Sequence, residues 1–236
     1  MSALLQVARL EAFYGASQIL HGVDFSVTRG EQVALIGRNG MGKTTLLRSL
    51  MGLVNDCRGD VSFAGRDIRR AAPEAISRAG IALVPEGRGV FGSLTVVENL
   101  TMAARPGSDG RQTWTLSRIF ELFPRLHQRR ANGGHQLSGG EQQMLTIGRA
   151  LMTNPDLILI DEATEGLAPL VAQDIWKTLG VIRGEGIATI VVDKDFRSLA
   201  KIADRAVLLS KGTVVFDGGP ASLTAQPELL ERYLGV

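Results

Sequence analysis

The sequence lacks several features that would place it in other classes of protein. It has a single cysteine, Cys57, so no internal disulfide can form, as is usual for proteins of the reducing cytosol. Its longest apolar runs, 157–160 and 187–192, have the length of strands and fall far short of the ~18–20 residues that cross a bilayer. Residues 1–5 have neither a basic region nor a long apolar core, so we expect no secretory signal. These absences predict a cytoplasmic chain with no membrane span of its own.

Neither sign of charge dominates the chain. The 26 lysine and arginine residues against 24 aspartate and glutamate residues give a formal net charge of +2, which is too small to indicate binding to nucleic acid. Of the 236 residues, 44% are hydrophobic and 21% are charged, which is ordinary for a globular protein and argues against disorder. We therefore expect a single folded domain over residues 1–236 and no nucleic-acid partner.

The first part of the sequence predicts antiparallel β structure followed by a different unit. Polar and apolar residues alternate over 5–10 and 23–27, which is the pattern of strands with one buried face. A short apolar run, 33–36, then leads into a glycine-rich segment, and 43–53 has helical spacing. A strand, a loop and a helix are therefore expected in succession.

The remainder predicts an α/β core interrupted by helices. Strand signals almost vanish between 95 and 152, so we expect an inserted helical subdomain over approximately 95–153. Strands of the parallel type return at 157–160 and 187–192, with a helix over about 169–184 between them. The other expected elements are strands at 60–64 and 81–84, a helix begun by Pro73, a hairpin of 207–210 and 213–216, and a C-terminal helix over 220–234.

The glycine-rich segment from Gly37 to Thr44 carries the first chemical signal. It fits the pattern G-x-x-x-x-G-K-[ST], in which glycines let backbone N–H groups approach phosphate oxygens at a helix N-terminus. The Lys43 ammonium would reach the β- and γ-phosphates, and the Thr44 hydroxyl would coordinate Mg²⁺. The candidate nucleotide contacts are the residues of this segment and the one after it: Gly37, Arg38, Asn39, Gly40, Met41, Gly42, Lys43, Thr44 and Thr45. The alternative, a glycine-rich turn without a ligand, does not account for the strand before it and the helix after it.

Two acidic residues complement this loop. The apolar run 157–160 leads to Asp161, which could hold Mg²⁺ as acids at strand ends do in nucleotide hydrolases. Glu162 follows directly, where it would orient or deprotonate an attacking water. Two acids after an apolar strand are weak evidence alone, but after a phosphate-binding loop they predict hydrolysis of ATP or GTP.

The segment from Leu137 to Gln143 adds a second anion-binding signal. Ser138 and Glu141 match the capping box S-x-x-E, so a helix should begin here with its N–H groups facing outward over Gly139 and Gly140. A well-capped helix alone is the alternative, and capping does not require two glycines. An exposed helix N-terminus that a phosphate can approach closely is a second phosphate site.

With these three motifs the chain resembles the ATP-binding-cassette (ABC) ATPases over essentially its whole length. Their signature motif is similar to the run Ser138, Gly139, Gly140, Glu141 and Gln142. The resemblance implies a P-loop NTPase fold with a RecA-like parallel-sheet core, an N-terminal antiparallel β subdomain and an inserted α-helical subdomain. It also implies that two cassettes pack head to tail, with the signature of one closing over the γ-phosphate of ATP on the other. A monomer would then be catalytically incomplete.

Further residues match positions of the family one at a time, and two loops narrow the resemblance to one subfamily. Tyr14, which lies outside those loops, resembles the aromatic residue that stacks on adenine. Glu86 stands where most cassettes have the glutamine of the Q-loop, which implies contacts with ATP and with Mg²⁺. The runs 85–88 and 165–169 are similar to those of the second ATPase subunit of branched-chain amino acid importers.

Two positions depart from the usual pattern of the family. Ala163 stands where proline commonly follows the catalytic glutamate, and we expect the change to be tolerated because it alters loop stiffness rather than chemistry. Lys194 occupies the switch position where most cassettes have histidine. A protonated lysine can meet the γ-phosphate but cannot accept a hydrogen bond, so it could not orient the attacking water as histidine does. The catalytic residues implied by the resemblance are Glu162, Lys43 and Lys194.

The resemblance implies an ATPase that uses ATP and Mg²⁺ to drive uptake of branched-chain amino acids, or of related amino acids and amides. Its partners would be a second cassette, with a heterodimer favoured, two integral membrane permeases and, indirectly, an extracytoplasmic binding protein. It would lie in the cytoplasm, peripheral on the inner face of the plasma membrane. The alternatives left open are the ATPase of a lipopolysaccharide exporter and a soluble cassette such as an iron–sulfur assembly factor.

Overall fold

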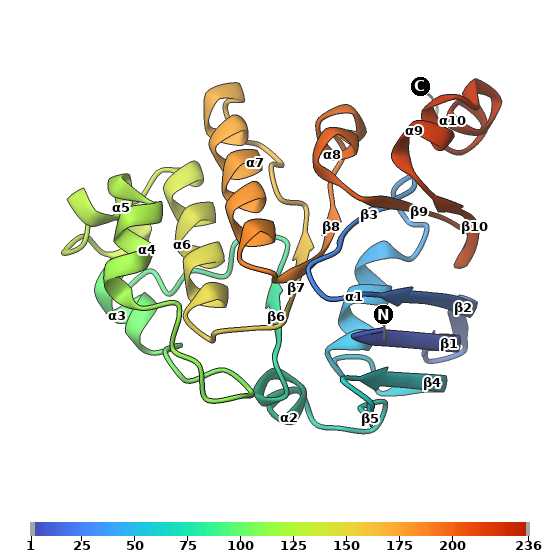
Figure 1. Cartoon of the computed structure of the whole chain (residues 1–236), viewed down its shortest axis with the longest axis horizontal. Helices are drawn as coiled ribbons and strands as arrows, with labels where there is room; N and C mark the ends of the chain where they lie inside the picture. Colours follow the sequence, from blue (N-terminus) through green and yellow to red (C-terminus); the bar gives the residue numbers. More distant parts are fainter. Residues whose placement is uncertain (1–2, 235–236) are drawn as a thin grey trace.

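The computed structural model describes residues 3–234, so residues 1, 2, 235 and 236 of the predicted domain lie outside the described part. Two β-sheets and the helices packed on them make up this part of the chain (Figure 1). The antiparallel sheet carries the N-terminus, and the helices between residues 96 and 151 lie at the opposite end. The predicted α/β fold with an antiparallel N-terminal unit is confirmed.

The smaller sheet is antiparallel, in the order β2-β1-β4-β5. Its strands are β1 (Leu5–Tyr14), β2 (Ser17–Val27), β4 (Asp56–Phe63) and β5 (Arg66–Asp67). The first two strands are longer than the predicted 5–10 and 23–27 because they stay paired up to Tyr14 and Ser17 at a tight turn. β4 begins four residues before the predicted 60 because its first residue, Asp56, pairs with Phe13.

The larger sheet has the order β10-β9-β3-β8-β7-β6. Its strands are β3 (Gln32–Ile36), β6 (Ile81–Val84), β7 (Leu157–Asp161), β8 (Ala188–Val192), β9 (Arg205–Ser210) and β10 (Thr213–Gly218). All neighbouring pairs are parallel except β9 and β10, which form the predicted hairpin. Five strands of this sheet therefore end at one common edge.

The helices are α1 (Lys43–Leu50), α2 (Pro73–Arg78), α3 (Val96–Thr101), α4 (Leu116–Leu122), α5 (Pro124–Gln128), α6 (Gly139–Leu151), α7 (Pro169–Gly184), α8 (Phe196–Ile202), α9 (Pro220–Thr224) and α10 (Pro227–Leu234), with a 3₁₀ turn at Gly134–Gln136. Helices α3 to α6 and the 3₁₀ turn fall within the segment predicted to be a helical insertion. The division of the chain at 95 and 153 stays a prediction.

Two predicted helices have the wrong bounds. The first, predicted over 43–53, ends at Leu50 because Gly52 takes the left-handed conformation at φ +68° and lets the Leu53 N–H bond back to the Arg48 carbonyl. The C-terminal helix predicted over 220–234 is two helices. Pro227 has no N–H and disfavours helical geometry in the residue before it, so α9 ends and α10 begins anew.

The larger sheet separates two apolar cores. Along β3, Val33 and Leu35 face α1 and the antiparallel sheet, whereas Ala34 and Ile36 face α6, α7 and α8. Helix α1 is packed between the two sheets through Leu46, Leu47 and Leu50. Because both faces of β3 are covered, its residues are all buried, and those after Gln32 form a continuous apolar run.

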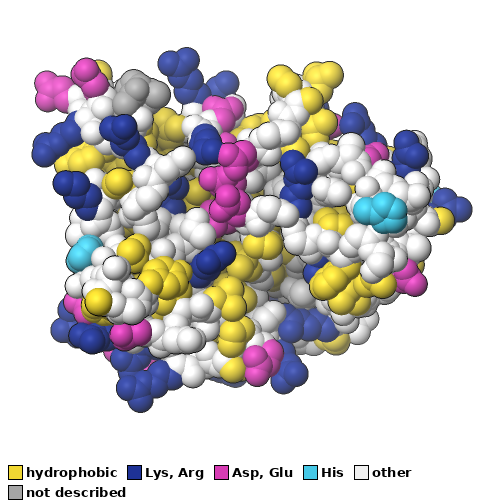
Figure 2. All heavy atoms as spheres, turned by 180° about the vertical axis from the view of Figure 1, so that it is seen from behind, with side chains coloured by type: hydrophobic (Ala, Val, Ile, Leu, Met, Phe, Trp, Pro, Cys, Tyr) yellow, Lys and Arg dark blue, Asp and Glu magenta, His cyan; other side chains and the backbone are white. Residues whose placement is uncertain are grey.

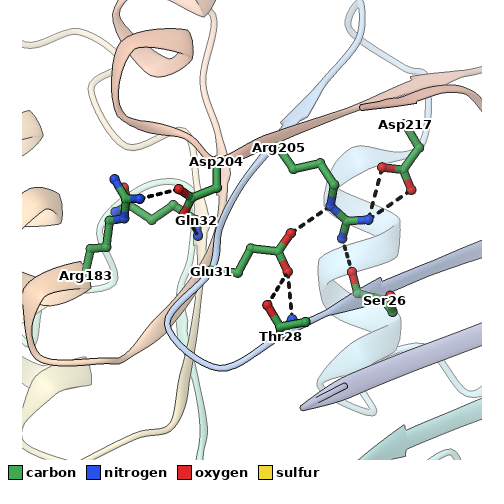
Figure 3. Close-up of polar contacts among 8 residues, drawn as sticks. All are labelled: Ser26, Thr28, Glu31, Gln32, Arg183, Asp204, Arg205 and Asp217. Atoms are coloured by element: carbon green, nitrogen blue, oxygen red, sulfur yellow. Dashed lines mark hydrogen bonds and ion pairs between the residues drawn. The ribbon is translucent and has the colours of Figure 1, made fainter. Parts of the chain in front are cut away.

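Arg205 joins the two sheets at the start of β9 (Figure 3). Its Nε donates to Glu31 Oε1 at 2.8 Å, and its Nη1 donates to both carboxylate oxygens of Asp217 at 3.0 and 3.2 Å. Its Nη2 donates to the Ser26 carbonyl of β2. Glu31 in turn accepts from the Thr28 N–H at 2.7 Å, so one guanidinium organises the connection between β2 and β3.

The surface carries both signs of charge. Seen from behind, lysine and arginine side chains are scattered around the outline, acidic side chains gather near the middle, and hydrophobic side chains form patches between them (Figure 2). Within residues 3–234, no helix is long and apolar enough to cross a membrane.

Replacing Arg205 by lysine should lower the free energy of unfolding by about 1–3 kcal/mol, because a lysine cannot bond at once to Ser26 of β2, Asp217 of β10 and Glu31 in the loop before β3. The measurement is denaturant unfolding. The control is Arg9→Lys, since Arg9 pairs with Asp60 at 3.6 Å with both side chains over 70% exposed, and this change should stay within about 0.5 kcal/mol. Equal losses in the two variants would show that Arg205 contributes only a surface charge.

Candidate functional site

Most of the predicted site residues follow the ends of adjacent parallel strands. The Gly37–Thr44 segment follows β3, Glu86 follows β6, Glu162 follows β7, and Lys194 follows β8. Parallel strands expose their carboxyl ends at one edge of the sheet, which is where ligands bind in open α/β folds. The order β3-β8-β7-β6 therefore brings together segments that are far apart in the sequence.

Two adjoining cavities of about 440 and 400 Å³ lie at this edge. Both are lined by Asn39, Lys43, Glu162 and Val192. The first also includes Gly37, Arg38, Asp193 and Lys194, and the second also includes Tyr14, Gly40, Gly42, Thr44, Thr45 and Glu86. Of the predicted loop residues, Met41 does not line either cavity and instead accepts a hydrogen bond from the Gly212 N–H through its carbonyl.

The Gly37–Thr44 loop has the backbone that a phosphate needs. Gly37 has φ +147°, and a Cβ there would lie 2.3 Å from the Leu209 carbonyl oxygen, so no larger residue fits. Gly42 caps α1 at φ +102°, and no side chain accepts from the first turn of that helix. The N–H groups at the start of α1 are therefore available to an anion, which the helix dipole also favours.

Lys43 lies across the loop. Its Nζ donates to the carbonyls of Gly37 at 2.7 Å and Arg38 at 2.9 Å. Burial lowers the pKa of Lys43, the nearby Asp161 carboxylate opposes this, and the Lys194 charge lowers it further. The ammonium is thus held at the cavity wall between the phosphate loop and Asp161.

Asp161 fits a divalent cation. The residue is 4% exposed, and its Oδ1 is buried without a hydrogen-bond partner. Burial raises its pKa, whereas a hydrogen bond from Thr44 lowers it. A carboxylate oxygen with no protein partner, a neighbouring hydroxyl and the nearby Glu86 carboxylate are the hard oxygen ligands that Mg²⁺ prefers.

Glu162 takes an unusual backbone conformation. Its φ is +57°, in the left-handed region, and its Oε2 is buried without a hydrogen-bond partner. The next residue, Ala163, is fully buried and donates its N–H to the Val192 carbonyl at 3.3 Å. The alanine is thus accommodated by packing and a bond to β8, and the carboxylate before it faces the cavity.

Lys194 is bound to the loop that follows Glu162. Its ammonium pairs with Glu165, and its Nζ lies 4.0 Å from Glu162 Oε1. Asp193 fixes the same two loops, because its Oδ2 accepts from the Thr164 N–H at 2.7 Å and from the Thr164 hydroxyl at 2.8 Å. Glu165 and Asp193 are not among the predicted functional residues, and only the spatial proximity of β7 and β8 identifies them.

The run of residues 138–142 lies apart from both cavities. The predicted capping box is present, since the Glu141 N–H donates to Ser138 Oγ at 3.4 Å and the Ser138 N–H donates to Glu141 Oε2 at 2.8 Å. None of these five residues lines the cavities beside Lys43. One chain therefore does not bring its two predicted phosphate sites together.

Packing provides a further reason for the two glycines at the start of α6. A Cβ on Gly140 would lie 2.4 Å from Val171 Cγ1 of α7, and a Cβ on Gly139 would lie 2.7 Å from the Arg88 guanidinium. Arg88 also donates weakly to Gln142 Oε1, at 3.4 Å. The sequence does not reveal Arg88 as a neighbour of this helix, because Arg88 and Gln142 are 54 residues apart.

The comparisons with known proteins agree with this geometry. The family model described as ABC transporter matches residues 20–165. The chain is 40% identical to the high-affinity branched-chain amino acid transport ATP-binding protein BraG of Pseudomonas aeruginosa, over 98% of this chain and 100% of that protein. It is 33% identical to the lipopolysaccharide export system ATP-binding protein LptB of Acidithiobacillus ferridurans, over 100% of this chain and 98% of that protein. A nucleotide-free ATP-binding cassette from an ABC transporter superposes with a TM-score of 0.84 at 25% identity, over 98% of each chain.

A matched pair of alanine substitutions tests the packing at the start of α6. Gly140→Ala should lower the free energy of unfolding by about 1–3 kcal/mol, because the new methyl group overlaps the branched Val171 side chain. Gly139→Ala should cost less, since the flexible end of Arg88 can move away. Thermal unfolding measures both changes, at about 2–4 °C per kcal/mol for a chain of this size. A larger loss for Gly139→Ala would contradict the assignment.

Proposed function

The chain belongs to the ABC transporter ATPase family, and from that membership we propose that it drives uptake of branched-chain amino acids, or of related amino acids and amides, through separate permeases. ATP hydrolysis as the ATPase subunit of a transporter follows from the family. The observation that carries the importer assignment is 40% identity to a branched-chain amino acid transport ATPase over nearly the whole of both chains.

ATP would bind across the two cavities at the edge of the larger sheet. Tyr14 is 46% exposed on the wall of the second cavity, where its ring can stack on adenine. The N–H groups at the start of α1 and the Lys43 ammonium would hold the β- and γ-phosphates. Arg38 and Asn39 are exposed on the loop beside them.

Thr44, Asp161 and Glu86 would hold Mg²⁺, which supplies charge neutralisation and orientation of the phosphates when bound. Glu162 would act on the water that attacks the γ-phosphate. Its carboxylate lines both cavities and has one oxygen free of protein partners, so it can accept a proton or a hydrogen bond from that water.

A second cassette would complete the catalytic site. The separation of the Ser138–Gln142 run from the Lys43 cavities supports a head-to-tail pair in which each chain closes over the nucleotide of the other. We favour a paralogous cassette as the partner, together with two integral membrane permeases and, indirectly, an extracytoplasmic binding protein. The chain would lie in the cytoplasm on the inner face of the plasma membrane, with no nucleic-acid partner.

A lipopolysaccharide exporter ATPase is the second candidate. The 33% identity to a lipopolysaccharide export protein favours it, and that likeness also spans the whole chain. The subfamily runs at 85–88 and 165–169 favour the importer instead. The two readings differ in the membrane subunits that should accompany the chain.

Purification of the tagged chain from detergent-solubilised membranes tests the assignment. We expect two hydrophobic permeases and a second cassette, and we expect deletion of the gene to abolish uptake of a labelled branched-chain or related amino acid. Recovery of lipopolysaccharide-export subunits would overturn the importer proposal. Recovery of no membrane subunit would overturn the transport proposal altogether.

The resemblance to importer ATPases implies that the permease contacts the segment 86–95, and the same purification with Phe91→Ala probes that contact. Phe91 is 44% exposed beside the loop that carries Glu86, with the Arg149 guanidinium 4.6 Å from its ring centre. We expect the variant to lose the permeases and transport while its affinity for ATP stays within about two-fold. The control is Leu53→Ala, which truncates an apolar side chain that is 49% exposed and lies outside the segment around Phe91. This variant should retain the permeases, transport and ATP binding. Parallel loss of ATP binding would show that Phe91 acts on the nucleotide site.

The presence of lysine at position 194, where most cassettes have histidine, leads to a prediction about which site turns over faster. A lysine already paired with Glu165 cannot accept a hydrogen bond, so it cannot orient water as a histidine does. We therefore expect Glu162→Gln in this chain to remove the smaller part of the ATPase activity of the assembled pair, and the equivalent change in the partner cassette to remove the larger part. The measurement is phosphate release. Loss of nearly all activity from Glu162→Gln would identify this site as the dominant one.

A further inference from the structure

Lys194 has a long side chain whose ammonium lies within ion-pair distance of two carboxylates. It lines the same cavity as Lys43 and Glu162. Its ammonium is bonded to Glu165, and its Nζ is 4.0 Å from Glu162 Oε1. Without a partner, the four-carbon stem of a lysine carries about 2 kcal/mol of rotamer entropy and would leave the ammonium spread over many positions.

The ion pair is not what holds the two loops together. Asp193 binds both the N–H and the hydroxyl of Thr164, and its other oxygen accepts from the Asp195 N–H at 2.8 Å. The Ala163 N–H is bonded to the Val192 carbonyl. The loop that carries Glu165 is therefore attached to the loop that carries Lys194 through neighbouring residues, so removing the Glu165 charge should leave the loops in place.

The Lys194 ammonium also offsets repulsion within a cluster of three carboxylates. One carboxylate oxygen from each of Glu86, Glu162 and Glu165 lies within 4.8 Å of the other two. Like charges at such distances repel, and Lys194 forms ion pairs with two of the three carboxylates, those of Glu162 and Glu165. The hydrogen bond to Glu165, with added attraction from Glu86 and Asp193, raises the pKa of Lys194 and keeps its ammonium charged.

We propose that Glu165 is a positioning residue that holds the Lys194 ammonium beside Glu162, where it meets the terminal phosphate of ATP. This rests on the proposed function, in which the cavity beside Lys43 binds ATP. Lys194 then supplies a positive charge at the place where charge develops during hydrolysis, although it does not orient the water. Glu165 touches neither the nucleotide nor the water and acts only through the lysine.

The experiment uses the assembled transporter in which the catalytic glutamate of the partner cassette is replaced by glutamine, so that turnover reports this chain's site. Glu165→Gln should lower kcat roughly five-fold, about 1 kcal/mol in the barrier, with KM for ATP within about two-fold. Glu165→Asp should restore most of kcat. Lys194→Gln should lower kcat as well, and the double variant should be no slower than Lys194→Gln alone because the two residues act as a unit.

Glu185→Gln is the matched control, since Glu185 forms a comparable ion pair with Arg118 far from the cavities. It should leave kcat unchanged. Thermal unfolding of all variants separates a loss of fold from a loss of positioning. Mass-spectrometric mapping of amine acylation gives a second reading that needs no turnover: ATP should protect Lys194 in the wild-type chain and protect it less in Glu165→Gln.

Two outcomes would overturn the proposal. An unchanged kcat in Glu165→Gln, with unchanged protection of Lys194 by ATP, would mean that the ion pair has no role in the reaction. A rise in kcat would mean that Glu165 withdraws the lysine from the nucleotide. Both differ from failure of the proposed function, in which the wild-type chain itself would not bind ATP and acylation of Lys194 would be the same with and without the nucleotide.

Discussion

The common direction of the strands in the larger sheet is the constraint on which the site depends. β3, β8, β7 and β6 are neighbours and run parallel, so the loops after them meet although those after β3 and β8 are far apart in the sequence. The loops supply groups of opposite charge: backbone N–H groups and an ammonium after β3, carboxylates after β6 and β7, and a second ammonium after β8. Burial of both faces of the sheet fixes their spacing, because no strand can shift without disturbing two cores.

The parts of the site that were predictable from sequence are those encoded by a short contiguous motif. Gly37 to Thr44 and Asp161 with Glu162 are contiguous runs, and each follows an apolar strand that periodicity identifies. The capping box at Ser138 is local for the same reason. The fold class was predictable as well, because alternation and continuous apolar runs distinguish the two sheets.

The remaining features depend on which elements become neighbours. The Lys194–Glu165 pair exists because β7 lies beside β8, and the Gly140 contact exists because α7 packs on α6. The early start of β4 follows from pairing with β1, which no pattern within β4 reveals. The break at Pro227 is a different case, since the proline was visible in the sequence and its effect on the preceding residue was overlooked.

The Arg205 connection has a mechanical consequence. Tyr14 lies on the antiparallel sheet and the phosphate loop lies on the parallel sheet, so the two ends of a bound nucleotide would touch different sheets. A guanidinium bonded at once to the Ser26 carbonyl, Glu31 and Asp217 keeps those sheets from sliding past each other (Figure 3). In the proposed binding mode, the site for adenine and the site for the phosphates would keep a constant separation, so the connection through Arg205 would fix the length of nucleotide that the two sheets can hold.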